Sequence, residues 1–198
     1  MGKIYKNSAV TIAATGSVDS QGGCFQDREP RLVQPCKLHG YLSSSGATAV
    51  KQDLYIYTRT WPWLNDGRLN TRGWVFQERL LSPRILHYGS QQLHWECLEH
   101  QASEKFPEGL EAWDAQPSRE ERLKTILSPP TLKSRPWIDE DFAKMLEEQP
   151  TRYADWAQLV GLYSQLHLTK SEDILIALSA LAKEWAIFLN DEYLAGLW

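Results

Sequence analysis

The stretch RGWVFQERLLSPRILHYGSQQLHWEC, residues 72–97, holds the clearest structural signals in the chain. Asn70 or Thr71 is suited to cap a helix over about residues 72–81, and Pro83 ends it because proline cannot continue a helix. The segments RILHYG and QQLHWEC, joined by a Gly-Ser turn, are typical of the two strands of a β-hairpin. The stretch therefore predicts a helix followed by a hairpin.

The residues before this unit add strands and loops. The pattern of residues 2–9 (GKIYKNSA) predicts the end of a helix, and that of residues 10–15 (VTIAAT) predicts a short buried strand. Residues 16–50 are rich in Gly, Ser, Pro and Asp, which indicates loop with one or two short strands. DLYIYTR (53–59) alternates and predicts a further strand. These elements favour an α/β core.

The residues after the hairpin predict helices. Short helices are expected at about 118–127 and 138–147, and aromatic residues at helical spacing predict another from Thr151. A last helix begins after a cap at Thr169 or Ser171. We expect its buried side to hold Ile174, Leu175, Leu178, Leu181, Ala182 and Trp185. The fold class is thus an α/β core with a β-hairpin and a helical C-terminal segment.

Composition narrows the function classes. The net charge of −4 is split into +5 over residues 1–95 and −9 over residues 96–198, and neither half has the dense Lys/Arg run of a nucleic-acid binder. No apolar run reaches membrane-spanning length. The odd cysteine count, with no secretory leader at MGKIYKNSAV, predicts a reducing, cytoplasmic location.

The hairpin also raises the question of a metal or thiol site. Candidate ligands fall within fourteen residues, at His87, His94, Cys97 and His100. On a strand, however, His94 and Cys97 point to opposite faces. A thiol dyad at Cys97 is disfavoured because a cysteine at a strand end is more often a small buried hydrophobe. We expect His94 and Glu96 on one face, Trp95 and Cys97 on the other, packed face, and no metal.

Glu78 is the polar residue that best fits chemistry. On the predicted helix it lies one turn beyond Trp74 and next to Arg79, with Arg72 nearly two turns earlier. Aromatic surface would desolvate the carboxylate and raise its pKa, whereas the arginines would hold it ionised. Such a glutamate can bind ribose hydroxyls or stabilise an oxocarbenium-like cation during glycosidic cleavage. The alternative is a structural Glu–Arg pair that fixes the helix to its neighbours.

Four segments together resemble the fungal heterokaryon incompatibility (HET) domain. They are IYKNSAVTIAATGSVDSQGGCF (4–25), LNTRGWVFQERLLSPRILHYGSQQLHWEC (69–97), LTKSEDILIALSALA (168–182) and DEYLAGLW (191–198). Their order is that of the family, and they are spread over nearly the whole chain. The resemblance implies that residues 1–112 are the C-terminal half of a HET domain whose upstream half is absent, and that residues 113–198 are a helical extension continuous with it.

The resemblance also carries expectations about function. HET domains act in fungal non-self recognition and programmed cell death, and they are similar to TIR domains, which have flavodoxin-like folds and of which some cleave NAD. By this analogy Glu78 is the catalytic candidate, Arg72, Trp74 and Arg79 are ligand-binding candidates, and NAD is a substrate rather than a cofactor. The alternatives are a non-enzymatic module that self-associates or binds partner signalling domains, and a truncated chain that is inactive alone.

Overall fold

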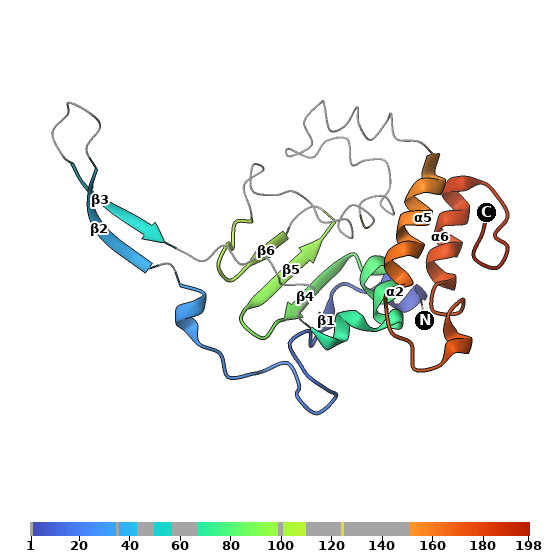
Figure 1. The fold of residues 1–198 in the computed structure, drawn as a ribbon, viewed down its shortest axis with the longest axis horizontal. Helices are drawn as coiled ribbons and strands as arrows, with labels where there is room; N and C mark the ends of the chain where they lie inside the picture. Colours follow the sequence, from blue (N-terminus) through green and yellow to red (C-terminus); the bar gives the residue numbers. More distant parts are fainter. Residues whose placement is uncertain are drawn as a thin grey trace.

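The computed structural model describes residues 2–34, 36–42, 50–56, 67–98, 101–109, 124 and 151–198 (Figure 1). Its helices are α1 (Gly2–Lys6), α2 (Gly73–Leu81), α5 (Thr151–Tyr163) and α6 (Ser179–Leu189). Its strands are β1 (Thr11–Ala13), β2 (Cys36–Leu42), β3 (Val50–Ile56), β4 (Arg84–Tyr88), β5 (Leu93–Cys97) and β6 (Gln101–Ser103). The helices predicted at 118–127 and 138–147 lie outside the described residues, apart from Lys124.

The main sheet mixes parallel and antiparallel strands. Its order is β1-β4-β5-β6, with β1 and β4 parallel and the remaining neighbours antiparallel. The predicted hairpin is therefore confirmed as β4–β5, and the mixed α/β class is confirmed with it. Strands β2 and β3 form a separate two-stranded sheet, which extends away from the main sheet in Figure 1.

The helix predicted over residues 72–81 is confirmed as α2, but its predicted caps are wrong. Asn70 and Thr71 lie in a short 3-10 helix (Arg68–Thr71), so Arg72 takes the N-cap position, with an extended backbone and no side-chain cap. The amide of Gly73 instead donates to the carbonyl of His167 at 2.9 Å. A backbone hydrogen bond to a residue distant in sequence thus satisfies an amide at the start of α2, where a side-chain cap was expected.

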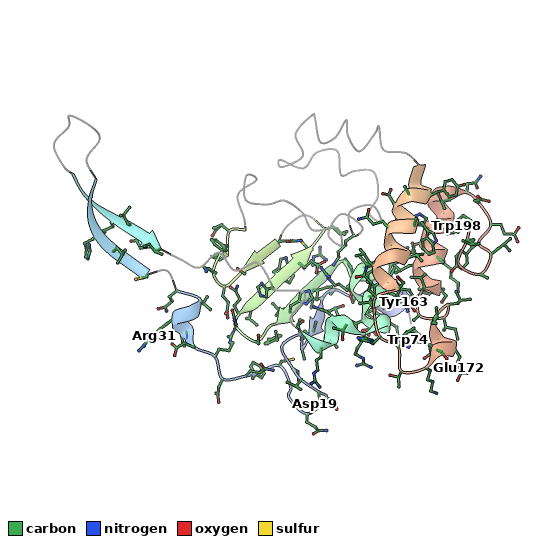
Figure 2. All side chains as sticks on the ribbon, in the orientation of Figure 1. Asp19, Arg31, Trp74, Tyr163, Glu172 and Trp198 are labelled. Atoms are coloured by element: carbon green, nitrogen blue, oxygen red, sulfur yellow. The ribbon has the colours of Figure 1, made fainter. Side chains whose placement is uncertain are left out.

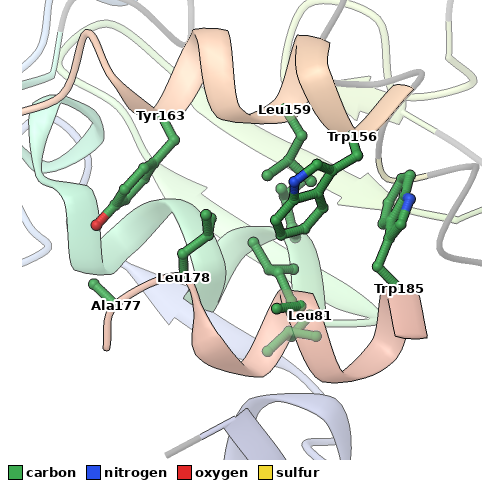
Figure 3. Packing of buried hydrophobic residues seen from close by; sticks show 10 residues of the cluster. Leu81, Trp156, Leu159, Tyr163, Ala177, Leu178 and Trp185 are labelled. Atoms are coloured by element: carbon green, nitrogen blue, oxygen red, sulfur yellow. The ribbon is translucent and has the colours of Figure 1, made fainter. Parts of the chain in front are cut away.

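The apolar core lies between α2, α5 and α6 (Figure 3). Trp185, Leu159 and Leu181 are fully buried in it, and Leu80 and Leu81 enter it from α2. Because α2 lies before residue 112 and the other two helices lie after it, residues from both predicted parts of the chain share one core. Burying a side chain of this size contributes about 2 kcal/mol or more.

The predicted buried side of the last helix is confirmed in its second half. Leu178, Leu181, Ala182 and Trp185 are buried as expected. Ile174 and Leu175, expected on the buried side, are instead 48% and 45% exposed. The reason is that Ser171–Asp173 form a 3-10 helix and α6 begins only at Ser179, so the expected helical face does not extend back to these residues.

Two expectations about strand burial are also wrong. The strand expected to be buried, β1, is at one end of the strand order, and Ile12 on it is 60% exposed. In β5 the alternation holds, but the fully buried face carries His94 and Glu96 rather than Trp95 and Cys97, which are half-buried. The interior face of the hairpin is therefore polar, which requires partners for each of its polar groups.

Candidate functional site

Helix α2 sends two neighbouring charged side chains in different directions. Successive residues of an α-helix are about 100° apart around its axis. Arg79 accordingly reaches the sheet, where its Nε–H donates to Glu96 Oε2 at 2.9 Å. Glu78 lies on the side of α2 toward the N-terminal helix α1 instead, where the Tyr5 hydroxyl acts on the pKa of its carboxylate. The two residues therefore belong to two separate polar clusters. The side chains of the described residues are drawn as sticks in Figure 2.

The first cluster consists of Glu78, Tyr5 and Arg72. Burial raises the pKa of Glu78 above its ordinary value, although the Tyr5 hydroxyl and the positive charge of Arg72 both act to lower it. Burial, together with the nearby Glu78 carboxylate, raises the pKa of Tyr5 to about 12. Desolvation thus outweighs the favourable partners, which leaves a half-buried carboxylate with a raised pKa.

The second cluster is centred on Glu96, which is 1% exposed. In addition to Arg79, its carboxylate contacts His87 Nε2 at 3.1 Å and Lys124 Nζ at 3.2 Å. Burial alone would raise the pKa of Glu96, but the charges of Arg79 and Lys124 and the hydrogen bond from His87 hold it well below the ordinary value. Glu96 is therefore ionised throughout the physiological pH range and neutralised inside the protein.

His87 connects Glu96 to the strand β1 side of the sheet. Burial lowers the pKa of His87, so its imidazole is neutral, with one donor nitrogen and one acceptor nitrogen. The ionised Glu96 can only accept, so Nε2 of His87 donates to it. The other nitrogen, Nδ1, then accepts from the Thr15 hydroxyl at 2.9 Å.

The row Thr15–His87–Glu96 contains the residue types of a nucleophile, a base and an orienting acid. Thr15, however, is only 2% exposed and His87 only 1%. A substrate therefore has no access to the hydroxyl in this structure. We assign the second cluster a structural role, in which it satisfies the polar interior face of the hairpin and holds α2 against the sheet.

The structure brings together some of the predicted site residues and separates others. Arg72 acts on Glu78 as predicted from their spacing. Arg79 pairs with Glu96, so the structural Glu–Arg pair considered from the sequence forms with a glutamate other than Glu78. Trp74 packs against the apolar core, and its indole N–H donates to Asp173 Oδ2 at 3.2 Å, which ties α2 to the segment before α6.

Sequence reasoning did not find Tyr5 or the Glu96 cluster. Tyr5 lies 73 positions before Glu78, and no local periodicity connects them. The strand alternation correctly groups Glu96 with His94, but it predicts the other face, with Trp95 and Cys97, as the packed one, whereas the face of Glu96 is the buried one. Within the residues that the structure describes, no group of three or more His, Cys, Asp or Glu side chains is arranged to hold a metal ion. In the same residues no helix is long and apolar enough to cross a membrane.

Comparison with known proteins gives one family. Residues 1–78 match the family described as heterokaryon incompatibility protein (HET), and the match ends at Glu78. Searches of curated proteins and of solved structures gave no significant match. The domain boundary expected at residue 112 stays a prediction. The matched segment contains α1, β1 and most of α2. Residues 1–78 of this chain are thus HET-domain sequence.

Proposed function

We propose that this chain acts in heterokaryon incompatibility, as a cell-death effector that cleaves NAD or a related nucleotide at Glu78. The HET match over residues 1–78 supports the biological role. The observation that carries the chemistry is the half-buried Glu78 carboxylate, whose pKa burial raises although the Tyr5 hydroxyl and the positive charge of Arg72 act to lower it. The proposal includes a TIR-like, flavodoxin-like fold, and the parallel β1–β4 pair is consistent with such a fold.

The proposed reaction needs a carboxylate in a partly desolvated place. Cleavage of the bond between ribose and nicotinamide leaves positive charge on the sugar, which a carboxylate stabilises best where water does not screen it. Glu78 fits this role. Arg72 is exposed and provides a guanidinium for the phosphates of the nucleotide.

The other two proposed ligand-binding residues, Arg79 and Trp74, are engaged by other parts of the protein. Arg79 is held by Glu96, and Trp74 is held by the apolar core and Asp173. Their proposed contribution to nucleotide binding is therefore to fix α2, and with it Glu78 and Arg72. Substitution of either residue is expected to weaken binding through displacement of the helix.

The proposal is tested by expressing the chain in fungal cells and following viability and NAD content. We expect Glu78→Gln to abolish both cell death and NAD loss, because it removes the charge that stabilises the developing cation. Glu104→Gln is the matched control, since Glu104 forms an ion pair with Arg28 near the protein surface. Cell death that persists in Glu78→Gln would contradict the proposal.

A second candidate is a non-enzymatic module that self-associates or binds a partner signalling domain. It is favoured by large apolar side chains on α6 and on the C-terminal tail, where Ile187, Leu194 and Leu197 are 74%, 64% and 73% exposed. On this view Glu78→Ala leaves cell death intact, whereas Leu197→Asp abolishes it. The opposite pattern, with assembly and stability unchanged, would remove this candidate.

A further inference from the structure

Strands β2 and β3 form an antiparallel pair, here called the β2–β3 ribbon, that stands apart from the rest of the fold. The ribbon is a sheet of its own and projects away from the main sheet (Figure 1). Among the described elements, its two strands contact mainly each other. A two-stranded ribbon alone is only marginally stable in water, because a sheet needs a second layer against its apolar face. The ribbon is therefore a place where a partner layer would stabilise the protein.

The strand register gives the β2–β3 ribbon two chemically different faces. Residues that lie opposite each other share a face, and the faces alternate along each strand. The apolar face carries the pairs Cys36–Ile56 and Leu38–Leu54. The polar face carries the pairs Lys37–Tyr55 and His39–Asp53. The charged side chains described on the ribbon thus all lie on one side of it.

The polar face finds its partners within the ribbon. Asp53 bridges the two cations across the strands, since its Oδ2 lies 2.6 Å from Lys37 Nζ and its Oδ1 lies 2.7 Å from His39 Nδ1. Lys37 Nζ also lies 5.8 Å from the centroid of the Tyr55 ring. These side chains are exposed to water, so their charges are both paired and solvated. The polar face therefore requires no second molecule.

The apolar face, by contrast, is uncovered. Leu38, Leu54 and Ile56 are 43%, 36% and 57% exposed, and the Cys36 thiol beside Ile56 is exposed as well. Gly40 lies on the same face, and a Cβ atom added to it would lie 3.1 Å from Leu54 Cδ1. The Leu54 side chain thus leans over Gly40 and makes the apolar surface continuous between the strands. Covering this surface would remove apolar area from water.

The absence of charge on the described part of this face indicates what can cover it. A charged partner would lose its hydration there without gaining a counter-charge. A second copy of the ribbon offers the same uncharged surface, and a two-fold axis brings identical patches together in a self-complementary contact. In such a contact the charges of Lys37, His39 and Asp53 remain in water on the two outer faces.

The dimensions of the ribbon set the strength of this contact. Each strand has seven residues, so the face measures roughly 24 Å by 10 Å. Two such faces pack about 10 Å apart with their strands within about 30° of each other. The covered area is on the order of 200–300 Å² in projection on each copy, well below the roughly 800 Å² on each side of a standard stable interface. The contact is thus expected to be weak and dependent on concentration.

We propose that the apolar face of the β2–β3 ribbon is a self-association surface, through which two copies of the chain pack face to face into a two-layer, four-stranded sandwich. Because the ribbon projects from the main sheet, the rest of each copy stays clear of the contact (Figure 1). The surface is separate from α6 and the C-terminal tail, and it does not depend on nucleotide cleavage at Glu78. It joins chains that are brought to a high local concentration.

The first test is sedimentation velocity of the 198-residue chain in a reducing buffer, from about 5 μM to about 500 μM. We expect the wild type to shift from monomer toward dimer, with a Kd on the order of 100 μM. Leu54→Asp is expected to weaken association at least about tenfold, because it buries an unpaired carboxylate in the contact. Tyr55→Asp is the matched control, since it adds the same charge one residue away, on the polar face and opposite Lys37. It is expected to associate as the wild type does.

The second test uses the wild-type chain, so no substitution can disturb its fold. The rate at which iodoacetamide labels Cys36 is measured by mass spectrometry at the lowest and the highest protein concentration. We expect the rate to fall severalfold at high concentration, because Cys36 lies on the apolar face. Cys24 is half-buried outside the ribbon and provides the internal control, whose rate is expected to stay constant.

Four results would overturn the inference. They are a wild-type chain that remains monomeric up to the highest concentration, equal association by Leu54→Asp and Tyr55→Asp, and a dimer in which Cys36 is labelled as fast as in the monomer. The fourth is a dimer that Leu197→Asp abolishes and Leu54→Asp does not. That pattern would assign self-association to the C-terminal tail, where Leu197 is 73% exposed.

Discussion

The Arg79 guanidinium donates to the Glu96 carboxylate at 2.9 Å, across the contact between α2 and the hairpin β4–β5. This pair places a full negative charge in the interior, where His87 and Lys124 also contact it. Forming such a cluster costs desolvation free energy. Removing one of its members destabilises the protein further, because each remaining charge is left without its partner. The stability of the sheet and the placement of α2 both depend on it.

Glu96→Gln is expected to destabilise the protein by about 3 kcal/mol or more, because Arg79 and Lys124 lose the carboxylate that neutralises them. Urea unfolding measures the loss. The control is Glu104→Gln, which removes a carboxylate from a pair with Arg28 whose side chains are about a third exposed. That change is expected to cost less than about 1 kcal/mol. Equal losses in the two variants would contradict the structural role of the buried cluster.

Stability is expected to fall as the pH is lowered from about 7 to about 5. Burial, together with the proximity of His87, lowers the pKa of His94 to about 4, and burial also lowers that of His87. In this range the unfolded chain binds protons on both histidines while the folded chain does not, so protons favour unfolding. His94 alone accounts for roughly 2 kcal/mol of the loss.

The measurement for this prediction is urea unfolding of wild type and His94→Gln at both pH values. The variant is expected to lose less stability on acidification, with the remainder due to His87. His167→Gln, on an exposed residue, is the control and is expected to behave as wild type. Glu96 does not contribute in this range, because its depressed pKa matters only below the pKa of an unfolded glutamate. An unchanged loss in His94→Gln would refute the assignment.

Trp185→Ala is expected to destabilise the protein by about 3–5 kcal/mol, because it leaves a cavity between α5 and α6. Trp185 is fully buried, and its ring packs against that of Trp156 with the centroids 5.8 Å apart and the planes tilted by 50°. Ile187→Ala on the same helix is the control, since Ile187 is 74% exposed. Thermal unfolding compares the two. A loss of stability in Trp185→Ala as small as that in Ile187→Ala would contradict the burial of Trp185 in the core.

Two glycines are expected to respond in opposite directions to alanine. Gly161 lies in α5 with nothing within 4 Å of an added Cβ, so Gly161→Ala should stabilise by roughly 0.5–1 kcal/mol. An added Cβ on Gly67 would clash with the carbonyl oxygen of Thr15. Gly67→Ala should therefore destabilise by about 1–3 kcal/mol. Thermal shifts of the same sign in both variants would contradict the packing described for these positions.

The local elements of the fold could be predicted from the sequence. Helix α2 and the hairpin β4–β5 follow from patterns within about ten residues each, and the structure confirms both. The start of α6 was placed too early because Ile174 and Leu175 continue its apolar spacing, although the chain there forms a 3-10 helix and turns. Spacing alone does not distinguish a helix from a succession of turns.

The polar interior could not be predicted in the same way. The sequence predicts that the apolar side of β5, with Trp95 and Cys97, is the buried one, because burying Glu96 is unfavourable unless cations reach it. Those cations come from Arg79 and Lys124, which lie far from each other in sequence. The effect of Tyr5 on the pKa of Glu78 likewise joins residues that are far apart in sequence. Both depend on tertiary packing, which a single sequence does not display.

The central claim is that Glu78 gives this chain the ability to cleave a nucleotide. The most direct measurement is nicotinamide release from NAD by the purified 198-residue chain, alone and after forced clustering, for wild type, Glu78→Gln and Glu104→Gln. We predict release by wild type and Glu104→Gln, and a loss of at least about a hundredfold in Glu78→Gln. No release by the clustered wild-type chain, or equal release by the folded Glu78→Gln variant, would contradict the account.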